Sequence, residues 1–251
     1  MTLKFYIKTV MKNKIMVYAF AAFLFLSVLV IIRNNNLGTI LPEYDIFRHV
    51  YSIYFTHFLV VPVYIFFVLS NNTMFFSSIT LIRYKTPYNA LMQRIMFLFT
   101  ETLCFSGIFY LSGLVSIVIM DVNAFTKLPY ILWIMEFLIQ YASLLFIGAT
   151  LLCIKNLTGN SLAAGIITFI VLSIDFIFVA TGFWIDYSVL YLYISSMKRY
   201  VFWGIGIPDI IISLWRFMLL SIVFMALSFL IYYIRIKRRK PYDWRAEDSL
   251  N

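Results

Sequence analysis

Residues 15–32 read IMVYAFAAFLFLSVLVII, a run of 18 residues without a charged side chain. A helix needs about 20 predominantly apolar residues to cross the hydrocarbon core of a bilayer, so this run predicts a transmembrane helix. Five further runs of comparable composition follow it, each with at most one Asp, Glu, Lys or Arg inside. Together the six runs predict transmembrane helices at residues 15–32, 50–70, 95–119, 128–154, 161–182 and 210–234.

The composition of the chain agrees with a membrane protein. Charged residues make up 12% of it and hydrophobic residues 63%, whereas a typical soluble domain is about 25% charged. The six runs and their connections use nearly all of the 251 residues. We therefore expect a single all-α transmembrane domain over residues 1–251, with no separate soluble domain.

The basic residues are distributed unevenly between the two sides of the predicted spans. Fourteen of the 20 Lys and Arg residues fall on the side that holds both chain ends, five fall on the other side, and Arg216 lies inside the last run. The side richer in Lys and Arg is usually cytoplasmic, so both termini are expected in the cytoplasm. The net charge of +9 then faces anionic lipid headgroups, and no nucleic-acid partner is expected.

Residues 2–14 predict a short amphipathic helix in the cytoplasmic interface. Lysines recur at intervals of four on one helical face, and apolar side chains occupy the opposite face. Such a pattern suits a helix that lies along the membrane surface. The alternative is a solvated run before the first span. The lysines of this predicted interfacial helix are Lys4, Lys8 and Lys12.

The predicted cytoplasmic loop between the second and third spans, residues 83–94, reads RYKTPYNALMQR. Pro87 can begin a helix with Thr86 as its N-cap, and that helix would run into the third span. Basic and tyrosine side chains would then gather at the membrane surface, although ordinary positive flanking of a span is an alternative. The candidate residues of this loop are Arg83, Tyr84, Lys85, Thr86, Pro87, Tyr88 and Arg94.

Residues 183–208, on the predicted outer side, are too aromatic for an exposed loop and too short to cross the bilayer twice. Two short helices that dip into the outer leaflet fit this composition better, because non-helical backbone at that depth must be buried in protein. We therefore expect a re-entrant outer segment between the fifth and sixth spans.

Four ionisable residues lie inside the predicted spans: Glu101, Glu136, Asp175 and Arg216. A charge at the bilayer centre costs on the order of 3 kcal/mol, so such residues usually face protein or water. At a rise of ~1.5 Å per residue, Asp175 and Arg216 lie at matching depths of roughly 10 Å from the outer ends of their helices. This match predicts an ion pair, with Glu136 as a rival partner. The pair would serve as a structural link between helices or as part of an ion relay.

Signatures of enzymes were sought and are missing from the sequence. It contains no His-Glu-x-x-His, no Gly-x-Ser-x-Gly and no phosphate-binding Gly-x4-Gly-Lys-Ser/Thr motif. Its two Cys and two His residues are too few and too scattered to suggest a metal site. The chain is therefore expected not to be an enzyme, and no metal ligands are assigned.

The interfacial helix, six spans with both ends inside, the loop beginning IRYKT at residues 82–86 and the aromatic outer segment occur together in one chain. In this it resembles the membrane subunit of an ABC-2 type (type V) ABC transporter. Among these it is most similar to the small permeases of bacterial peptide, lantibiotic or toxin export and immunity systems. The resemblance rests on topology and on the IRYKT loop, and it covers nearly the whole chain.

The resemblance implies roles for three segments. In the family, the loop between the second and third spans is a coupling helix that docks on a separate ATPase subunit, and residues 83–94 match it here. The N-terminal helix, residues 3–11 here, also touches the ATPase. The outer segment 183–208 would correspond to the external helices that cap the transport pathway.

The resemblance also implies an assembly of two permeases and two ATPases in the bacterial plasma membrane. The second permease would be an identical copy or a related chain, and ATP and Mg would be bound by the ATPase, so that this chain binds no cofactor. The first, second and fifth spans line the dimer face in relatives. Aromatic residues of the second span are therefore candidates for the pathway: Tyr51, Tyr54, Phe55 and Phe58.

The expected function is thus that of a permease subunit in an ATP-driven exporter of an amphipathic peptide, antibiotic or lipid-like substrate. Two other classes stay open. One is a stand-alone membrane immunity protein that acts by binding, without an ATPase. The other is a secondary transporter that uses an intramembrane acid for ion coupling, although no inverted repeat is visible in the sequence.

Overall fold

The computed structural model describes residues 7–8, 10–35, 53–75, 87–120, 130–181 and 207–238. Within these ranges the chain is almost entirely helical and contains no strand, which confirms the all-α prediction for this part of the protein. The helices are α2 (Lys14–Asn35), α4 (Ile53–Phe55), the π-helix η1 (Thr56–Val60), α5 (Val61–Phe75), α7 (Pro87–Met120), α9 (Tyr130–Thr158), α10 (Ser161–Ala180) and α12 (Ile207–Arg238).

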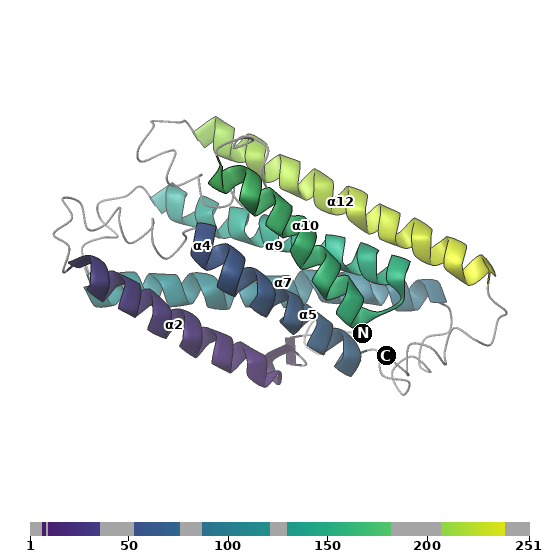
Figure 1. Cartoon of the computed structure of the whole chain (residues 1–251), viewed down its shortest axis with the longest axis horizontal. Helices are drawn as coiled ribbons and strands as arrows, with labels where there is room; N and C mark the ends of the chain where they lie inside the picture. The colour runs from purple at the N-terminus through teal and green to yellow at the C-terminus, as the bar shows by residue number, and fades with distance from the viewer. Residues whose placement is uncertain are drawn as a thin grey trace.

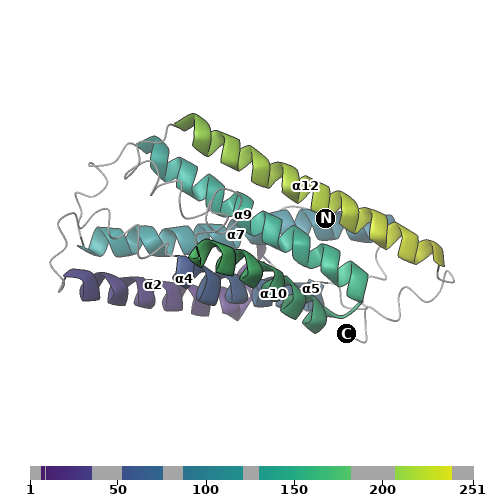
Figure 2. The same cartoon turned by 45° about the horizontal axis from the view of Figure 1, so that its top comes forward.

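The long helices lie alongside one another in an elongated bundle (Figure 1). Helix α9 is at its centre, because it packs against α12, α10, α7 and α5, whereas α2 packs mainly against α7. Residues 142–153 of α9 are all buried, so this helix is covered around its whole circumference. The view in Figure 2 shows the same arrangement from a direction turned by 45°, with α12 running along α9.

Four helices are long and apolar enough to cross a membrane: the stretches Tyr88–Ser116, Trp133–Thr158, Ser161–Phe178 and Leu214–Ile234. They correspond to the third to sixth predicted spans. Within the described ranges, the two N-terminal helices contribute shorter apolar stretches, Lys14–Leu26 and Thr56–Asn72. A total of six spans therefore stays a prediction.

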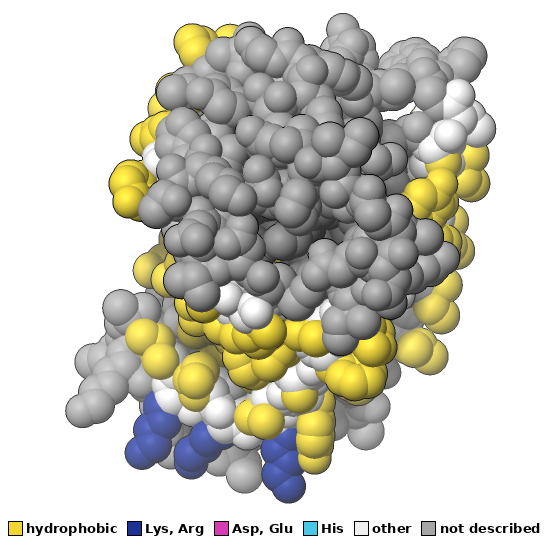
Figure 3. All heavy atoms as spheres, turned by 90° about the vertical axis from the view of Figure 1, so that its left-hand side faces the viewer, with side chains coloured by type: hydrophobic (Ala, Val, Ile, Leu, Met, Phe, Trp, Pro, Cys, Tyr) yellow, Lys and Arg dark blue, Asp and Glu magenta, His cyan; other side chains and the backbone are white. Residues whose placement is uncertain are grey.

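The exposed surface of α10 and α12 is apolar. In each of these helices only 22% of the apolar window is buried, against 78% in α9. Apolar side chains that face outward from a bundle are suited to contact with lipid tails. Figure 3 looks at the end of the bundle that lies on the left of Figure 1, and it shows hydrophobic side chains above a lower edge with Lys and Arg side chains.

Helix α7 begins at Pro87, as the sequence predicts. Its 34 residues continue without a break to Met120, so the predicted loop helix and the third span form one helix of about 51 Å. Because the hydrocarbon core of a bilayer is about 30 Å thick, α7 is longer than a helix needs to be to cross it.

The turn between α9 and α10 follows standard capping chemistry. Gly159 has a positive φ of 76°, and its N–H donates to the carbonyl of Lys155 at 2.8 Å, which closes the end of α9. The side chain of Asn160 then accepts hydrogen bonds from the N–H groups of Leu162 and Ala163 at the start of α10. This tight turn makes α9 and α10 antiparallel neighbours.

Several sequence-based expectations fall on residues outside the described ranges. They are residues 183–206 of the re-entrant segment, residues 2–6 of the interfacial helix and residues 83–86 of the loop before α7, whereas residues 207 and 208 form the start of α12.

Candidate functional site

Three side chains of α7, two buried and one exposed, connect this helix to four of its neighbours. We call the whole set of contacts the α7 junction. It contains two hydrogen-bonded chains of polar side chains and one cluster of aromatic rings. Its members are Asn13, Asn71, Tyr88, Arg94, Glu101, Asn156, Ser228, Phe229 and Tyr233.

The first chain joins α2, α5 and α7. The Asn13 Nδ2 donates to Asn71 Oδ1 at 2.6 Å, and the Asn71 Nδ2 donates to Glu101 Oε2 at 3.2 Å. All three side chains are buried. The Asn13 Oδ1 also accepts a hydrogen bond from the N–H of Ile15 at 3.0 Å, so the same amide caps the start of α2.

The direction of this chain is fixed by Glu101. The Glu101 Oε2 atom accepts a hydrogen bond, and a carboxyl oxygen that carries no proton can only accept, so the Asn71 amide turns its NH₂ group towards it. The Asn71 oxygen then faces Asn13 and needs a donor, which is the Asn13 NH₂ group. The Asn13 oxygen is left to accept from the backbone of α2. Each amide therefore has one orientation that satisfies its neighbours.

The second chain joins α7, α9 and α12. The Arg94 Nη1 donates to Asn156 Oδ1 at 3.5 Å, and the Asn156 Nδ2 donates to the Ser228 hydroxyl at 2.7 Å and to the Ser228 carbonyl at 3.3 Å. These three side chains are also buried. A buried polar group without a partner is costly, so this chain ties the three helices together at one level.

Electrostatics links the two chains. Arg94 and Glu101 are seven residues apart on α7, which places them on the same helical face. Arg94 and Lys155 both interact electrostatically with the Glu101 carboxylate. Two positive groups near one carboxyl group offset part of the cost of burying a charge there.

The aromatic cluster joins the first turn of α7 to the last turns of α12. The Tyr88 ring lies 6.0 Å from the Phe229 ring and 6.0 Å from the Tyr233 ring, measured between centroids. Phe229 and Tyr233 are four residues apart and so share one face of α12. The beginning of α7, which forms the second part of the predicted loop 83–94, is thereby packed onto the C-terminal part of α12.

Through the contacts of the junction, α7 connects four neighbouring helices along its length. Tyr88 and Glu101 are 13 residues apart, about 20 Å along the helix. Over this length α7 contacts α12, α9, α5 and, through Asn71, the start of α2. A displacement of the first turn of α7 must therefore move these neighbours with it or break buried hydrogen bonds.

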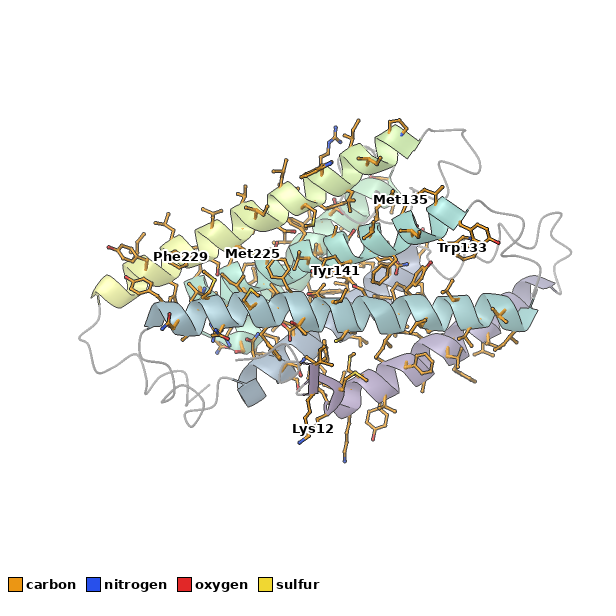
Figure 4. All side chains as sticks on the ribbon, turned by 180° about the vertical axis from the view of Figure 1, so that it is seen from behind. Lys12, Trp133, Met135, Tyr141, Met225 and Phe229 are labelled. Atoms are coloured by element: carbon orange, nitrogen blue, oxygen red, sulfur yellow. The ribbon has the colours of Figure 1, made fainter. Side chains whose placement is uncertain are left out.

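The residues predicted to lie at the cytoplasmic surface form two groups in the structure. Some belong to the α7 junction, and others are exposed. Arg94 and Tyr88 belong to the junction, and Pro87 begins α7. Lys8 and Lys12 are exposed, and Figure 4 shows Lys12 pointing away from the bundle near the start of α2. The remaining predicted residues of these two segments lie outside the described ranges: Lys4, Arg83, Tyr84, Lys85 and Thr86.

The four intramembrane charges have different surroundings. Glu101 is part of the junction, and Glu136 is buried on α9, where it accepts a hydrogen bond of 3.3 Å from Gln140 Nε2. Asp175 is half-buried on α10 and interacts electrostatically with His57. Arg216 is exposed on α12, which packs mainly against α9. The Asp175–Arg216 pair stays a prediction.

The aromatic residues predicted on the second span do not share one surface. Tyr54 and Phe58 are exposed and contact the Phe176 ring of α10 edge-on, with centroids 5.5 Å and 5.2 Å away. Phe55 lies on another face of the helix, where its ring approaches those of Phe23 and Phe109. Tyr51 lies outside the described ranges. A pathway surface on this helix would therefore use Tyr54 and Phe58, with Phe55 as a packing residue.

Within the part of the chain that the structure describes, no group of three or more His, Cys, Asp or Glu side chains could hold a metal ion. The contacts of the α7 junction instead depend on asparagines, which the sequence reasoning did not single out. A signal existed: Asn13, Asn71 and Asn156 flank or end long apolar runs, and an amide at such a position needs a partner.

Comparison of the chain with models of protein families, with curated proteins and with solved structures found no match in any of the three. What the described residues define is a helical bundle in which four helices could cross a membrane.

Proposed function

We propose that this chain is the membrane-spanning subunit of an ATP-driven exporter of the ABC-2 type, whose ATP is hydrolysed by a separate cytoplasmic subunit. The observation that supports this most is the α7 junction. A transport subunit without its own ATPase needs an element that receives a movement at the membrane surface and passes it to the other helices. Helix α7 begins at Pro87, within the predicted loop 83–94. It is hydrogen-bonded to α5 and α9 and, through Asn71 and Asn156, to Asn13 before α2 and Ser228 on α12.

In the proposed mechanism, ATP and Mg bind to two ATPase subunits, which close on each other. The loop 83–94 of each permease moves with the ATPase, and α7 carries the movement into the bundle. Two permease copies, identical or related, then shift at their shared face. An amphipathic peptide, an antibiotic or a lipid-like molecule moves between them or is drawn from the bilayer.

The proposal includes the finer topology. It places six spans in a bacterial plasma membrane with both termini in the cytoplasm, an interfacial helix at the N-terminus and a re-entrant segment on the outer side. The apolar outer surfaces of α10 and α12 support a position in lipid. The exposed lysines before and at the start of α2 support a position of that end at a headgroup layer.

The test is co-purification of the tagged full-length chain from its native host in mild detergent. We expect a P-loop ATPase to accompany the wild-type chain. The double substitution Arg83→Ala/Lys85→Ala should reduce its recovery by about tenfold, which corresponds to about 1.4 kcal/mol of binding free energy. Lys198→Ala/Arg199→Ala is the matched control, since it removes two positive charges from the predicted outer side and should leave recovery unchanged.

Two results would contradict the proposal. One is that the wild-type chain functions in its native host although no ATPase co-purifies with it. The other is an ATPase whose recovery falls equally with both double substitutions, because the loss would then reflect net charge and not the loop.

A further inference from the structure

His57 occupies an unusual position between the second helix and α10. Its side chain is only 1% exposed, and its ring is inserted between two phenyl rings of α10. The centroid distances are 5.0 Å to Phe169 and 4.5 Å to Phe176, with interplanar angles of 18° and 9°. Both faces of the imidazole are therefore covered, and Phe58 packs against it edge-on at 4.9 Å.

A π-helix presents His57 to α10. The five residues of η1, Thr56–Val60, interrupt the α-helical path between α4 and α5. A π-turn holds one more residue than an α-turn, and π-turns occur frequently at functional sites. In this turn the polar side chains of Thr56 and His57 are buried, while the apolar Phe58 is exposed. The π-turn thus directs the His57 imidazole into the bundle and leaves the Phe58 ring exposed.

The hydrogen bonds around the ring favour one tautomer of His57. The Ser173 hydroxyl donates to the Phe169 carbonyl at 2.8 Å, and it also lies 3.2 Å from His57 Nε2. A hydroxyl has one hydrogen, so when Ser173 donates it to the Phe169 carbonyl, Nε2–H of His57 is the donor in the second contact. The neutral ring then carries no hydrogen on Nδ1, and this buried atom has no hydrogen-bond partner.

Three titratable groups lie on the helices that pack against η1. They are Tyr54 on α4, Tyr64 on α5 and Asp175 on α10. The Tyr64 hydroxyl bonds to Thr102 Oγ1 at 2.7 Å, and the Tyr54 ring packs on Phe176. Asp175 interacts electrostatically with the imidazole. A carboxylate near the ring favours a proton on it, whereas burial of the ring between phenyl groups opposes the charge.

We propose that His57 is a proton-binding site that controls the contact between the second helix and α10. In the neutral ring, Nε2–H bonds to Ser173 and the two phenyl rings hold the imidazole, so that η1 is fastened to α10. Protonation at Nδ1 adds a charge and a second N–H donor to a position that supplies one acceptor. The imidazolium is then better placed outside the sandwich, nearer to the Asp175 carboxylate, and the contact loosens.

This inference does not depend on the proposed export function, because it concerns one helix contact within the chain. Under that function, the contact would connect the proton concentration to the packing of the second and fifth spans. The bound ligand is a proton from the surrounding water, and no covalent or redox step is involved.

The tautomer and the charge of His57 can be read directly by ¹⁵N NMR of the full-length protein in lipid. The chain has two histidines, so His49→Gln leaves His57 as the single histidine signal. We expect the Nε2–H neutral tautomer at pH 7.5 and imidazolium signals on acidification to pH 5.0. An Nδ1–H tautomer at pH 7.5, or a ring that stays neutral throughout, would overturn the proposal.

Thermal unfolding over the same pH range tests the consequence for packing. The wild-type melting temperature should fall by about 4 °C or more between pH 7.5 and pH 5.0, because a buried neutral histidine must become charged. His57→Phe keeps an aromatic ring between Phe169 and Phe176 but cannot take a proton, so its acid-induced fall should be much smaller. An equal fall in both proteins would show that another group is responsible. Should the Phe variant fail to fold, the NMR measurement still decides.

Discussion

Gly148 on α9 lies against side chains of both α5 and α7. A Cβ atom added at this position would lie 2.6 Å from the Tyr64 hydroxyl oxygen and 2.7 Å from Leu98 Cδ1. The Tyr64 hydroxyl cannot move away freely, because it is hydrogen-bonded to Thr102 Oγ1 at 2.7 Å. Small residues at helix contacts allow close approach of the backbones in membrane proteins, and Gly148 serves this purpose.

Gly148→Ala should therefore lower the free energy of unfolding by about 1–3 kcal/mol, the usual effect of overpacking a core. Gly107→Ala is the matched control within α7, since no atom lies within 4 Å of a Cβ at that position. Alanine is favoured over glycine in a helix interior by about 1 kcal/mol, so the control should be neutral or stabilising. Denaturant-induced unfolding of the purified protein measures both changes, and equal changes would contradict the packing argument.

Individual charged residues were easier to predict than their partners. Glu101 stands out because a carboxylate interrupts an apolar run, and the structure does place it in a buried network. Its partner Asn71 carries no charge and belongs to another helix, so its role follows only from how α5 and α7 pack. The same holds for Asn156, which has hydrogen-bond partners 62 and 72 residues away in the sequence.

At the scale of the helix, the start of α2 depends on a single side chain with two functions. The oxygen of the Asn13 amide caps α2, and its nitrogen donates to Asn71. The two functions can be separated by substitution. Serine keeps an oxygen for the cap but cannot reach Asn71 in the same way, and aspartate keeps the cap but replaces the donor by an acceptor.

Asn13→Asp should destabilise the protein more than Asn13→Ser does. In the Asp variant an oxygen would face the Asn71 oxygen at the position of a 2.6 Å hydrogen bond, and rotation of the Asn71 amide would withdraw the donor from Glu101. A buried acceptor without a donor costs about 1–3 kcal/mol. Thermal unfolding at neutral pH measures the difference. Equal stability of the two variants would show that the link to α5 contributes nothing beyond the cap.

The start of a helix was easier to predict from the sequence than an irregular turn inside a helix. Pro87 marks the start of α7 because proline is suited to the first turn of a helix. The π-turn at Thr56–Val60 has a weaker signal: Pro62 follows it and cannot donate a backbone hydrogen bond, but a proline within a helix does not specify a π-turn. Its wider turn is accompanied by the packing of His57 between two rings of α10, which no pattern within the second helix reveals.

For the whole molecule, apolar run lengths predict how many helices exist but not which of them are neighbours. The expected Asp175–Arg216 pair assumes that the fifth and sixth spans, being consecutive, also pack together. In the structure α10 and α12 both pack chiefly against α9. These two consecutive helices therefore share α9 as their main neighbour and do not pack chiefly against each other. The burial of residues 142–153 on every side of α9 identifies this helix as the common partner.

The number of spans is open to a direct test through accessibility of single cysteines in intact cells. The two native cysteines, Cys104 and Cys153, are free and can be replaced by serine. Asn36→Cys probes the connection after α2, Thr158→Cys the turn between α9 and α10, and Ser249→Cys the C-terminal tail. With six spans and both termini inside, a membrane-impermeant maleimide should label the Asn36 position in intact cells and the other two only after lysis.

A four-span protein gives a different pattern, and the reason lies in the two N-terminal helices. If α2 and the second helix lay on the inner surface, residue 36 would remain on the same side as the basic loop 83–94, and all three positions would be protected until lysis. The 22 residues of α2 extend about 33 Å, enough to cross a core of about 30 Å. A helix of that length whose start is fixed to Asn71 and Glu101 within the bundle runs alongside α7, which favours crossing. Labelling of residue 36 in intact cells is therefore the expected outcome.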